Sequence, residues 1–150
     1  MHNELSTLYQ ELILDHSLNP HNFGSIIKPS HFALGYNPLC GDKITIYMNI
    51  IFNKIIDIKF NGDGCAISRA SASMMTDYIK RKTLNEAKNI FQKFCLLLTV
   101  DNKVNNDCKL LGKLVVFSGV KKFPIRIKCA TLSWHTMKSA LNKNSNVEYD

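Results

Sequence analysis

The residues of this sequence most able to do chemistry are its five cysteines, Cys40, Cys65, Cys95, Cys108 and Cys129. Five thiols cannot all pair, and no secretion signal precedes them, so a disulfide framework is not expected. Free thiols and metal ligands are the remaining roles. No two cysteines have only two residues between them, so the short spacing of a zinc finger is missing. Spacing alone is therefore weak evidence for a metal.

Three of the cysteines lie at expected element boundaries, where a thiol can be reactive. Cys40 lies in the loop Asn37-Pro-Leu-Cys-Gly-Asp42, and Cys65 and Cys129 are each expected to begin a helix. A helix N-terminus stabilises a thiolate, which is the form that binds metal and attacks sulfur. With Asp42 as a fourth ligand, the set would suit tetrahedral zinc or iron in a cluster. On position alone, the alternative is that each cysteine is a small core residue.

The other candidate residues have ordinary structural explanations. Cys95 lies in an apolar helical stretch and is expected to be a core residue, whereas Cys108 is expected to be an incidental thiol in a polar loop. His16 and His135 are expected to be packing or surface residues. Asp63 is expected to be a turn residue rather than an acid catalyst.

Alternating apolar residues predict a β-hairpin with one buried face. The even-numbered residues from Ile44 to Phe52 are apolar. After a turn at Asn53-Lys54, Ile56, Ile58 and Phe60 are expected to continue the buried face. A short strand is expected before the hairpin, at about 31–36.

Helical patterns account for most of the remaining sequence. Thr83-Leu-Asn-Glu86 is a capping box that predicts the start of a helix. Phe123–Lys128 is expected to be extended, and the last helix to begin at Cys129. Other helices are expected from Asn3, as the cap, to before Pro20, from Cys65 onward, and from Lys109 to Phe117 with a stop at Gly119. Residues 101–108 are polar and turn-like.

Strands followed by helices predict an α+β fold, with a small antiparallel β-sheet packed against several α-helices. A chain of 150 residues, 45% of them hydrophobic, fits a single domain over residues 1–150. Its polar tail, about 143–150, is expected to fray.

The net charge of +7 does not indicate a nucleic-acid partner. Sixteen of the 19 basic residues are Lys, and they are scattered along the chain. A nucleic-acid surface more often clusters charge and interleaves aromatic residues. No apolar run approaches the roughly 18 residues of a membrane helix, and no signal peptide is visible. We therefore expect a cytoplasmic protein with no nucleic-acid or membrane partner.

Several longer motifs that run in order along the chain resemble those of one known family. The sequence is similar to the SufU-type branch of the IscU/NifU-N-like iron–sulfur cluster assembly proteins, from about Glu4 to Leu141. The motifs are Leu8-Tyr-Gln-Glu-Leu-Ile-Leu-Asp-His16, Asn19-Pro20, Asn22-Phe-Gly24, Asn37-Pro-Leu-Cys-Gly-Asp42, Gly62-Asp-Gly-Cys-Ala-Ile-Ser68, Ala70-Ser-Ala-Ser-Met-Met-Thr76, Phe117-Ser-Gly-Val120 and Phe123-Pro-Ile-Arg-Ile-Lys-Cys-Ala-Thr-Leu132.

The resemblance implies an IscU/SufU-like fold and a metal site. Cys40, Asp42, Cys65 and Cys129 match the metal ligands of the family. The implied partners are a cysteine desulfurase of the SUF type, which releases sulfur from cysteine as a persulfide, and other iron–sulfur assembly components. The implied cofactor is Zn²⁺, with an iron–sulfur cluster as the alternative.

Two departures from the IscU branch point toward the SufU branch. Lys128 stands where the IscU branch has a histidine before its third cysteine, and the segment between Cys65 and Cys129 is longer, with an extra helical piece at about Thr83–Leu98. The stretch that docks the IscU branch to its dedicated chaperone appears here as Phe123–Lys128. Chaperone-assisted release of a cluster is therefore not expected.

Three functions follow from these residues. The first is a zinc-dependent, sulfurtransferase-like acceptor of persulfide sulfur, with Cys40 as the acceptor because its Pro- and Gly-flanked loop can move. The second is a scaffold that assembles a [2Fe–2S]-type cluster on the same ligands, and the third is a structural zinc module. Arg126 and Lys128 are expected to offset the negative charge of the site, and Arg126 to contact an acidic group on the desulfurase.

Overall fold

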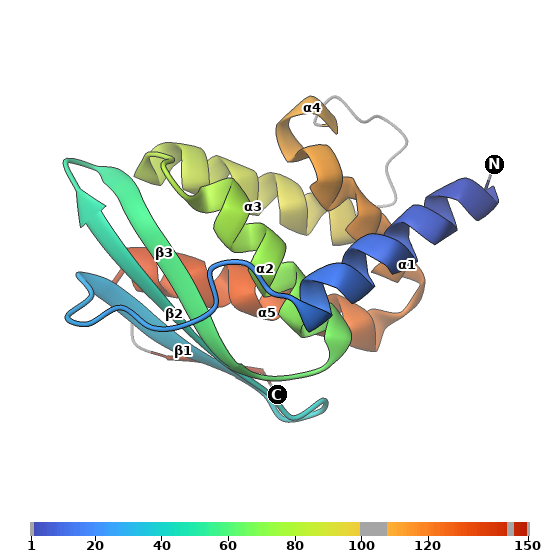
Figure 1. Cartoon of the computed structure of the whole chain (residues 1–150), viewed down its shortest axis with the longest axis horizontal. Coiled ribbons are helices and arrows are strands. Elements are labelled where there is room, and N and C mark those ends of the chain that lie inside the picture. Colours follow the sequence, from blue (N-terminus) through green and yellow to red (C-terminus); the bar gives the residue numbers. More distant parts are fainter. Residues whose placement is uncertain (1, 100–107, 144–145, 150) are drawn as a thin grey trace.

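Helices on one side and a twisted sheet on the other make up the structure (Figure 1). In this computed structural model, residues 2–99, 108–143 and 146–149 are described. Their elements, in chain order, are α1 (His2–Leu18), β1 (His31–Asn37), β2 (Asp42–Ile51), β3 (Lys54–Asp63), α2 (Ala66–Ile79), α3 (Leu84–Thr99), α4 (Cys108–Leu111), the 3₁₀ helix η1 (Gly112–Lys122), α5 (Pro124–Leu141) and β4 (Asn146–Glu148).

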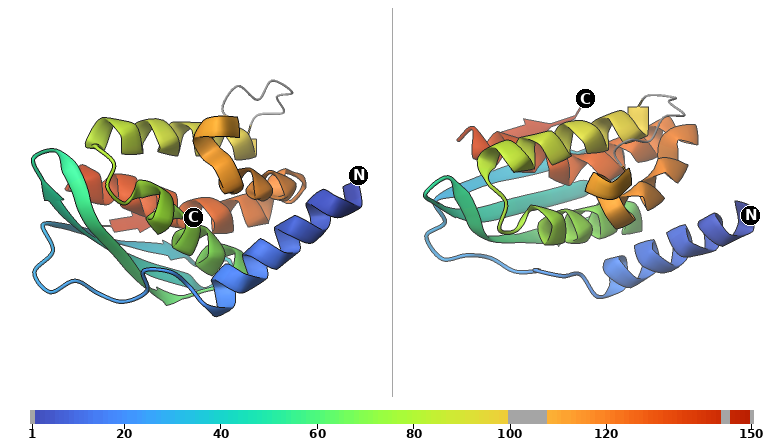
Figure 2. Two further views of the ribbon diagram at one scale, coloured as in Figure 1. Left: turned by 45° about the horizontal axis from the view of Figure 1, so that its top comes forward. Right: turned by 90° about the horizontal axis from the view of Figure 1, so that it is seen from above.

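The sheet has the strand order β3-β2-β1-β4. The first three strands are antiparallel, and β4 adds to β1 in parallel. Helices α2 and α5 pack against the sheet, α1 packs on α2, and α3 packs on α5 and η1. Figure 2 shows that the helices lie on one face of the sheet only. The predicted α+β class is therefore confirmed, with one parallel strand that the sequence did not indicate.

The core lies between the sheet and the helices. The ring of Trp134 in α5 stacks on Phe94 in α3, with ring centroids 4.3 Å apart. Phe94 also meets the ring of Phe117 in η1 edge-on, at 5.8 Å. These three side chains are fully buried, and burial of a large apolar side chain stabilises the fold by roughly 1.5–3 kcal/mol. This packing fixes α5, and with it Cys129, relative to the sheet.

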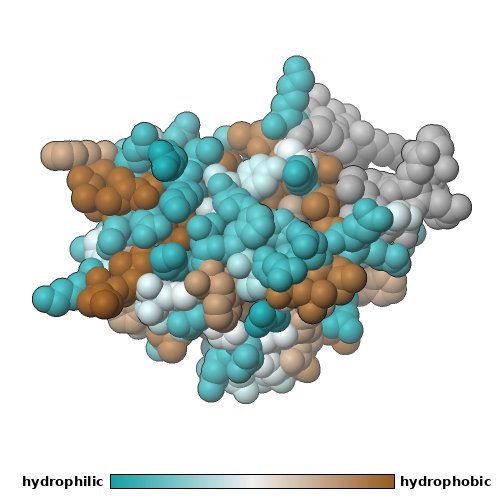
Figure 3. All heavy atoms as spheres, viewed as in Figure 1, coloured by the Kyte–Doolittle hydropathy of each residue, from teal (hydrophilic) through white to brown (hydrophobic). Residues whose placement is uncertain are grey.

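The β2–β3 hairpin forms as the alternation predicts, but its turn lies one residue earlier. Phe52 and Asn53 both have positive φ, 51° and 64°, as a two-residue type I′ turn requires. A register shift in the β2–β3 pairing, between Asn49 and Ile50, changes which residues near the turn face the core. Phe52 is consequently 99% exposed and Ile56 is 43% exposed, so their predicted burial is wrong. Figure 3 shows apolar side chains gathered at this end of the sheet.

The capping box at the start of α3 is confirmed. The backbone N–H of Glu86 donates to Thr83 Oγ1 at 3.1 Å, and the N–H of Thr83 donates to the Glu86 carboxylate at 2.9 Å. Helix α1 ends at Leu18, before Pro20, as expected. It begins at His2, so Asn3 lies inside the helix and is not its cap.

Two expectations for the second half of the chain are wrong. The predicted helix from Lys109 to Phe117 is the short α4 followed by η1, a 3₁₀ helix that continues through Gly119 to Lys122. Phe123–Lys128 is not extended, because α5 begins at Pro124. Proline suits the first helical position, where its missing N–H has no partner to lose.

The tail expected to fray contains a strand. In β4, Val147 is the register partner of Gly35 in β1, and the N–H of Tyr149 donates to the carbonyl of Tyr36 at 2.9 Å. The Tyr149 hydroxyl also bonds Thr131 Oγ1 at 2.9 Å. The turn expected at 101–108 falls almost entirely outside the described residues. Within the described part of the chain, no helix is long and apolar enough to cross a membrane.

We predict that Gly62→Ala destabilises the protein much more than Gly24→Ala. Both glycines have positive φ, 132° and 143°, so both variants are strained. Only at Gly62 would the added methyl group collide with backbone, the carbonyl oxygen of Lys43 in the paired strand. Urea denaturation should show at least about 2 kcal/mol of additional loss in Gly62→Ala. Equal losses in the two variants would contradict the close strand approach at this point.

Candidate metal centre

Cys40 lies in the tight connection between β1 and β2. Asn37, the last residue of β1, pairs with Asp42, the first residue of β2, so the two strands hold the ends of the turn together. The N–H of Cys40 donates to the carbonyl of Asn37 at 3.3 Å, and Gly41 has a positive φ of 69°. The Cys40 side chain is half-buried. The turn thus presents its thiol at the end of the sheet that faces the start of α2.

Asp42 has a fully buried carboxylate. One of its oxygens, Oδ1, accepts the backbone N–H of Cys65 at 2.8 Å. A side chain at Gly64 would place its Cβ only 2.8 Å from the same oxygen, so this close approach favours glycine. Among the described residues, no cationic side chain forms an ion pair with Asp42. A buried carboxylate in that position is expected to have a cation as its partner.

Cys65 is the N-cap of α2, so its predicted place at the start of a helix is confirmed. Its sulfur accepts the N–H of Ser68 at 3.4 Å and lies 4.0 Å from Asp42 Oδ2. A hydrogen bond from the Cys129 thiol lowers the pKa of Cys65 to about 6, against the opposing effect of burial, and the N–H of Ser68 adds to the lowering. In the metal-free protein, Cys65 is therefore ionised at neutral pH.

Cys129 is the fully buried cysteine of the set. It lies within α5 and not at its start, so the expectation that Cys129 begins a helix is wrong. Its sulfur lies 3.0 Å from Cys40 Sγ, and Asn37 Nδ2 donates to it at 4.0 Å. The hydrogen bond to Cys65, together with burial, raises the pKa of Cys129. Without a metal, this thiol keeps its proton.

The structure brings three of the four residues named from the sequence into one compact group, and the fourth lies beside it. Ligand atoms of Cys40, Asp42 and Cys129 all lie within 4.8 Å of one another. Cys65 is not part of that group, but its sulfur lies 4.0 Å from Asp42 Oδ2. Ligands of a tetrahedral zinc, with Zn–S of about 2.3 Å, stand roughly 3.8 Å apart. Two thiols and a carboxylate at this spacing, with a third thiol beside them, suit zinc, or iron in a cluster.

A groove of about 870 Å³ opens over two of the thiols. Cys40 and Cys65 line it, whereas the third thiol, that of Cys129, is buried behind them. Most of the other lining residues are apolar, and among them Leu39, Phe123 and Ile125 are 58–60% exposed. The groove is completed by Tyr9, Leu39, Ile67, Lys122, Phe123, Pro124, Ile125 and Arg126.

Sequence and structure comparisons agree with this site. The sequence matches the NifU-like N terminal domain family over residues 8–130. The chain belongs to that family. It is 42% identical to the zinc-dependent sulfurtransferase SufU of Bacillus subtilis, over 93% of this chain and 92% of the relative. It is 39% identical to the iron–sulfur cluster assembly scaffold protein IscU of Streptococcus pyogenes serotype M1, over 97% of this chain and 90% of the relative.

Solved structures of this family share the fold. FiSufU of Fervidobacterium islandicum AW-1, a protein of the SUF system, superposes with a TM-score of 0.83 at 36% identity, over 90% of this chain and 97% of that one. The NifU-like N-terminal domain of Brucella abortus has a TM-score of 0.79 at 19% identity, over 91% of this chain and 93% of that one. The second likeness concerns the fold alone.

Of the two basic residues predicted beside this NifU-type site, Arg126 contacts it. Arg126 is exposed in the first turn of α5, and its guanidinium hydrogen-bonds the Cys129 sulfur, which raises the pKa of Arg126. Lys128 is half-buried immediately before Cys129. The structure gives it no ion pair within the described residues, so its charge-offsetting role stays a prediction.

Of the residues given structural explanations, Cys95, His16 and His135 lie outside the site. Cys95 is half-buried in α3, where burial raises its pKa to about 11. His16 is buried, and His135 meets the ring of Phe91 at 5.1 Å. The side chain of Cys108 is outside the described part of the structure.

Sequence reasoning overlooked two residues of the site, Asn37 and Tyr9. Asn37 is fully buried next to Cys129, and its Oδ1 has no hydrogen-bond partner within the described residues. Tyr9 lines the groove from α1. Both lie inside motifs that resemble the family, yet neither residue type is a metal ligand of this kind of site. Spacing therefore gave no reason to single them out.

We predict that alkylation separates these thiols by pH in the metal-free protein. Because the lowered pKa makes Cys65 a thiolate above about pH 6, its reaction with iodoacetamide should rise through pH 6 and then level off. Cys95, with a pKa of about 11, should be almost fully protonated at pH 7.5. It should react roughly ten- to thirtyfold more slowly, because the greater nucleophilicity of its thiolate offsets only part of the thiolate's scarcity. Peptide mass spectrometry between pH 5 and 9 measures both rates. A Cys65 rate that climbs through pH 8.5, as for a free thiol, would contradict this assignment.

Proposed function

We propose that this chain is a zinc-dependent sulfur acceptor that takes persulfide sulfur from a cysteine desulfurase through Cys40. Membership of the NifU-like N-terminal domain family, with relatives named SufU and IscU at about 40% identity, makes it an iron–sulfur cluster assembly protein. The finer proposal rests on the difference among the three thiols of the site in burial and in the backbone that carries them.

Only one of the thiols is both accessible and carried by a turn. Cys129 is fully buried within α5, and Cys65 is held by its N-cap hydrogen bond to α2. Cys40 lines the groove and lies between Pro38 and Gly41, in a turn outside both strands. Moving Cys40 therefore disturbs few backbone hydrogen bonds. Displacing either of the other two would disrupt a helix.

The proposed chemistry is a thiol–disulfide type exchange. Bound zinc would hold the cysteine ligands deprotonated at neutral pH without changing oxidation state. The Cys40 thiolate attacks the outer sulfur of the desulfurase persulfide. A new S–S bond forms at Cys40 while the S–S bond of the donor breaks, and the donor cysteine leaves as a thiolate. Sulfur moves with no external oxidant or reductant.

The surroundings of Cys40 support a protein partner at the groove. Leu39, Phe123 and Ile125 are 58–60% exposed at its rim and would be covered by a docked surface. Three thiolates, one carboxylate and Zn²⁺ sum to a charge of −2. Arg126 offsets part of that charge through its contact with Cys129, and its exposed position suits an acidic group on the desulfurase.

A cluster scaffold is the alternative function, since the same four ligands can hold iron. The Streptococcus pyogenes relative is named a scaffold protein. Against it, Lys128 stands where the resemblance to the IscU branch would place a histidine. A structural zinc module is less favoured, because the ligands span positions 40 to 129 instead of lying in short hairpin knuckles.

Elemental analysis of protein purified without added metal, followed by a desulfurase turnover assay on the same sample, tests the proposal. About one zinc per chain with accelerated turnover is the expected result. Iron with acid-labile sulfide would favour the scaffold. Zinc without any effect on turnover would favour the structural module.

We predict that Cys40→Ala abolishes stimulation of the desulfurase, whereas Cys95→Ala leaves both stimulation and metal content unchanged. After incubation of the wild-type protein with desulfurase and cysteine, mass spectrometry should locate one added sulfur atom on Cys40. Circular dichroism should show that the Cys40→Ala variant keeps its fold. Retained stimulation in Cys40→Ala, or added sulfur on Cys65 in the wild-type protein, would remove Cys40 from the acceptor role.

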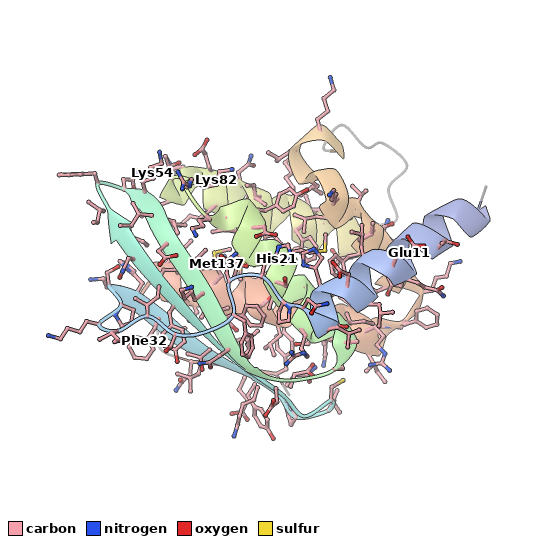
Figure 4. The ribbon with its side chains drawn as sticks, viewed as in Figure 1. Glu11, His21, Phe32, Lys54, Lys82 and Met137 are labelled. Atoms are coloured by element: carbon pink, nitrogen blue, oxygen red, sulfur yellow. The ribbon has the colours of Figure 1, made fainter. Side chains whose placement is uncertain are left out.

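We predict that Arg126→Ala weakens the productive encounter with the desulfurase while zinc content stays the same. Loss of a charge contact at an interface should raise the KM for this protein roughly tenfold. The matched control is Lys54→Ala, which removes one positive charge at the far end of the β2–β3 hairpin (Figure 4). Equal KM values for the two variants would mean that Arg126 offsets negative charge at the site but does not contact the desulfurase.

A further inference from the structure

A second group of metal-binding side chains lies at the other end of α2. Ligand atoms of His16, His21 and Asp77 all lie within 4.8 Å of one another. Asp77 is twelve residues along the helix sequence from Cys65, which corresponds to roughly 18 Å of helix. None of these three residues contributes to the cysteine site or to its groove.

His16 is held in a fixed orientation beneath the surface. It is 7% exposed, and its Nδ1 makes a hydrogen bond of 2.6 Å with Ser73 Oγ. Ser73 is fully buried in α2 and also accepts the backbone N–H of His21 at 2.8 Å. One buried hydroxyl therefore positions both histidines. In metal sites, a ligating histidine is typically oriented by such a bond from its other ring nitrogen.

His21 and Asp77 form the exposed side of the group. Their side chains are 50% and 39% exposed, and His21 Nδ1 lies 2.6 Å from Asp77 Oδ2. Asn22 Nδ2 donates to the other carboxylate oxygen at 3.1 Å, which fixes the carboxylate plane. Figure 4 shows His21 where the segment after α1 crosses α2. An ion from solvent can therefore reach the group without any opening of the core.

We propose that His16, His21 and Asp77 form a second metal site, which binds a first-row divalent transition metal independently of the cysteine centre. Two imidazoles and one carboxylate are donors that suit iron(II), cobalt(II), nickel(II) and zinc, and they leave positions for water. Ligand atoms about 2.1 Å from an ion stand roughly 3.0–3.5 Å apart. The group, now within 4.8 Å, needs only small adjustments to reach this spacing, and His21 Nδ1 and Asp77 Oδ2, now 2.6 Å apart, must separate slightly.

The surroundings of His16 keep its ring neutral, which is the form that binds a metal. Burial, then the neighbouring His21, lowers the pKa of His16, and the carboxylates of Asp77 and Asp15 only partly oppose this lowering. The same hydrogen bonds would, without any metal, serve to fasten the segment after α1 to α2. The partial exposure of His21 and Asp77 is more than such a fastening needs, and it provides the route for an ion.

Cobalt titration of protein loaded with one equivalent of zinc tests the proposal, because the thiols of the cysteine centre take that zinc first and leave the second site open. Isothermal titration calorimetry should show one Co²⁺ bound per chain, and absorption should show no sulfur-to-cobalt charge-transfer band. His21→Ala and Asp77→Asn, both on exposed positions, should each weaken cobalt binding at least tenfold, since even outer-shell changes cost 10–100-fold. Binding of zinc at the cysteine centre should be the same in both variants.

The matched control is His31→Ala, which removes a different histidine that also bonds a serine hydroxyl. Its cobalt affinity should equal that of the wild-type protein. Circular dichroism and thermal unfolding establish that each variant is folded. The proposal is overturned if wild-type protein loaded with one equivalent of zinc binds no cobalt, or if His21→Ala and Asp77→Asn bind it as the wild-type protein does. Either result would mean that these hydrogen bonds only hold the segment after α1 against α2.

Discussion

The buried carboxylate of Asp42, bonded to the backbone N–H of Cys65, is the interaction on which the rest of the site depends. It joins the first residue of β2 to the N-terminus of α2, where the helix dipole favours negative charge. Gly64 permits this contact because a Cβ there would crowd the carboxylate. One N–H bond is little compensation for a buried ion. A metal cation would supply the missing partner, and would give a physical reason for the thiols around it.

Three separate segments converge on that carboxylate. The β1–β2 turn brings Cys40, the N-cap of α2 brings Cys65, and the second turn of α5 brings Cys129. Because aromatic packing in the core fixes α5, Cys129 is the rigid member of the set. The thiols therefore differ in burial and in the backbone that carries them, and Cys65 and Cys129 also differ in protonation. A site built only to hold metal would not need that difference, whereas transfer of sulfur through one thiol does.

Local chemistry made much of this structure predictable. The capping box at Thr83, the hairpin and the helix start at Cys65 follow from interactions between near neighbours in sequence. Phe123–Lys128 was misread because its alternating apolar and basic residues fit a strand as well as an exposed first helical turn. The strand β4 forms by pairing with β1, more than a hundred residues away, which no local pattern records. The four ligands were assigned through family resemblance, since their spacing alone left a core role open.

X-ray absorption at the zinc edge, on protein purified without added metal, tests the central claim most directly. It counts the atoms bound to the metal and needs neither a partner protein nor a variant. We expect three sulfur atoms at about 2.3 Å and one oxygen at about 2.0 Å, as Cys40, Cys65, Cys129 and Asp42 would provide. A shell of nitrogen and oxygen atoms alone would contradict the claim, because the metal would then be bound away from the cysteines.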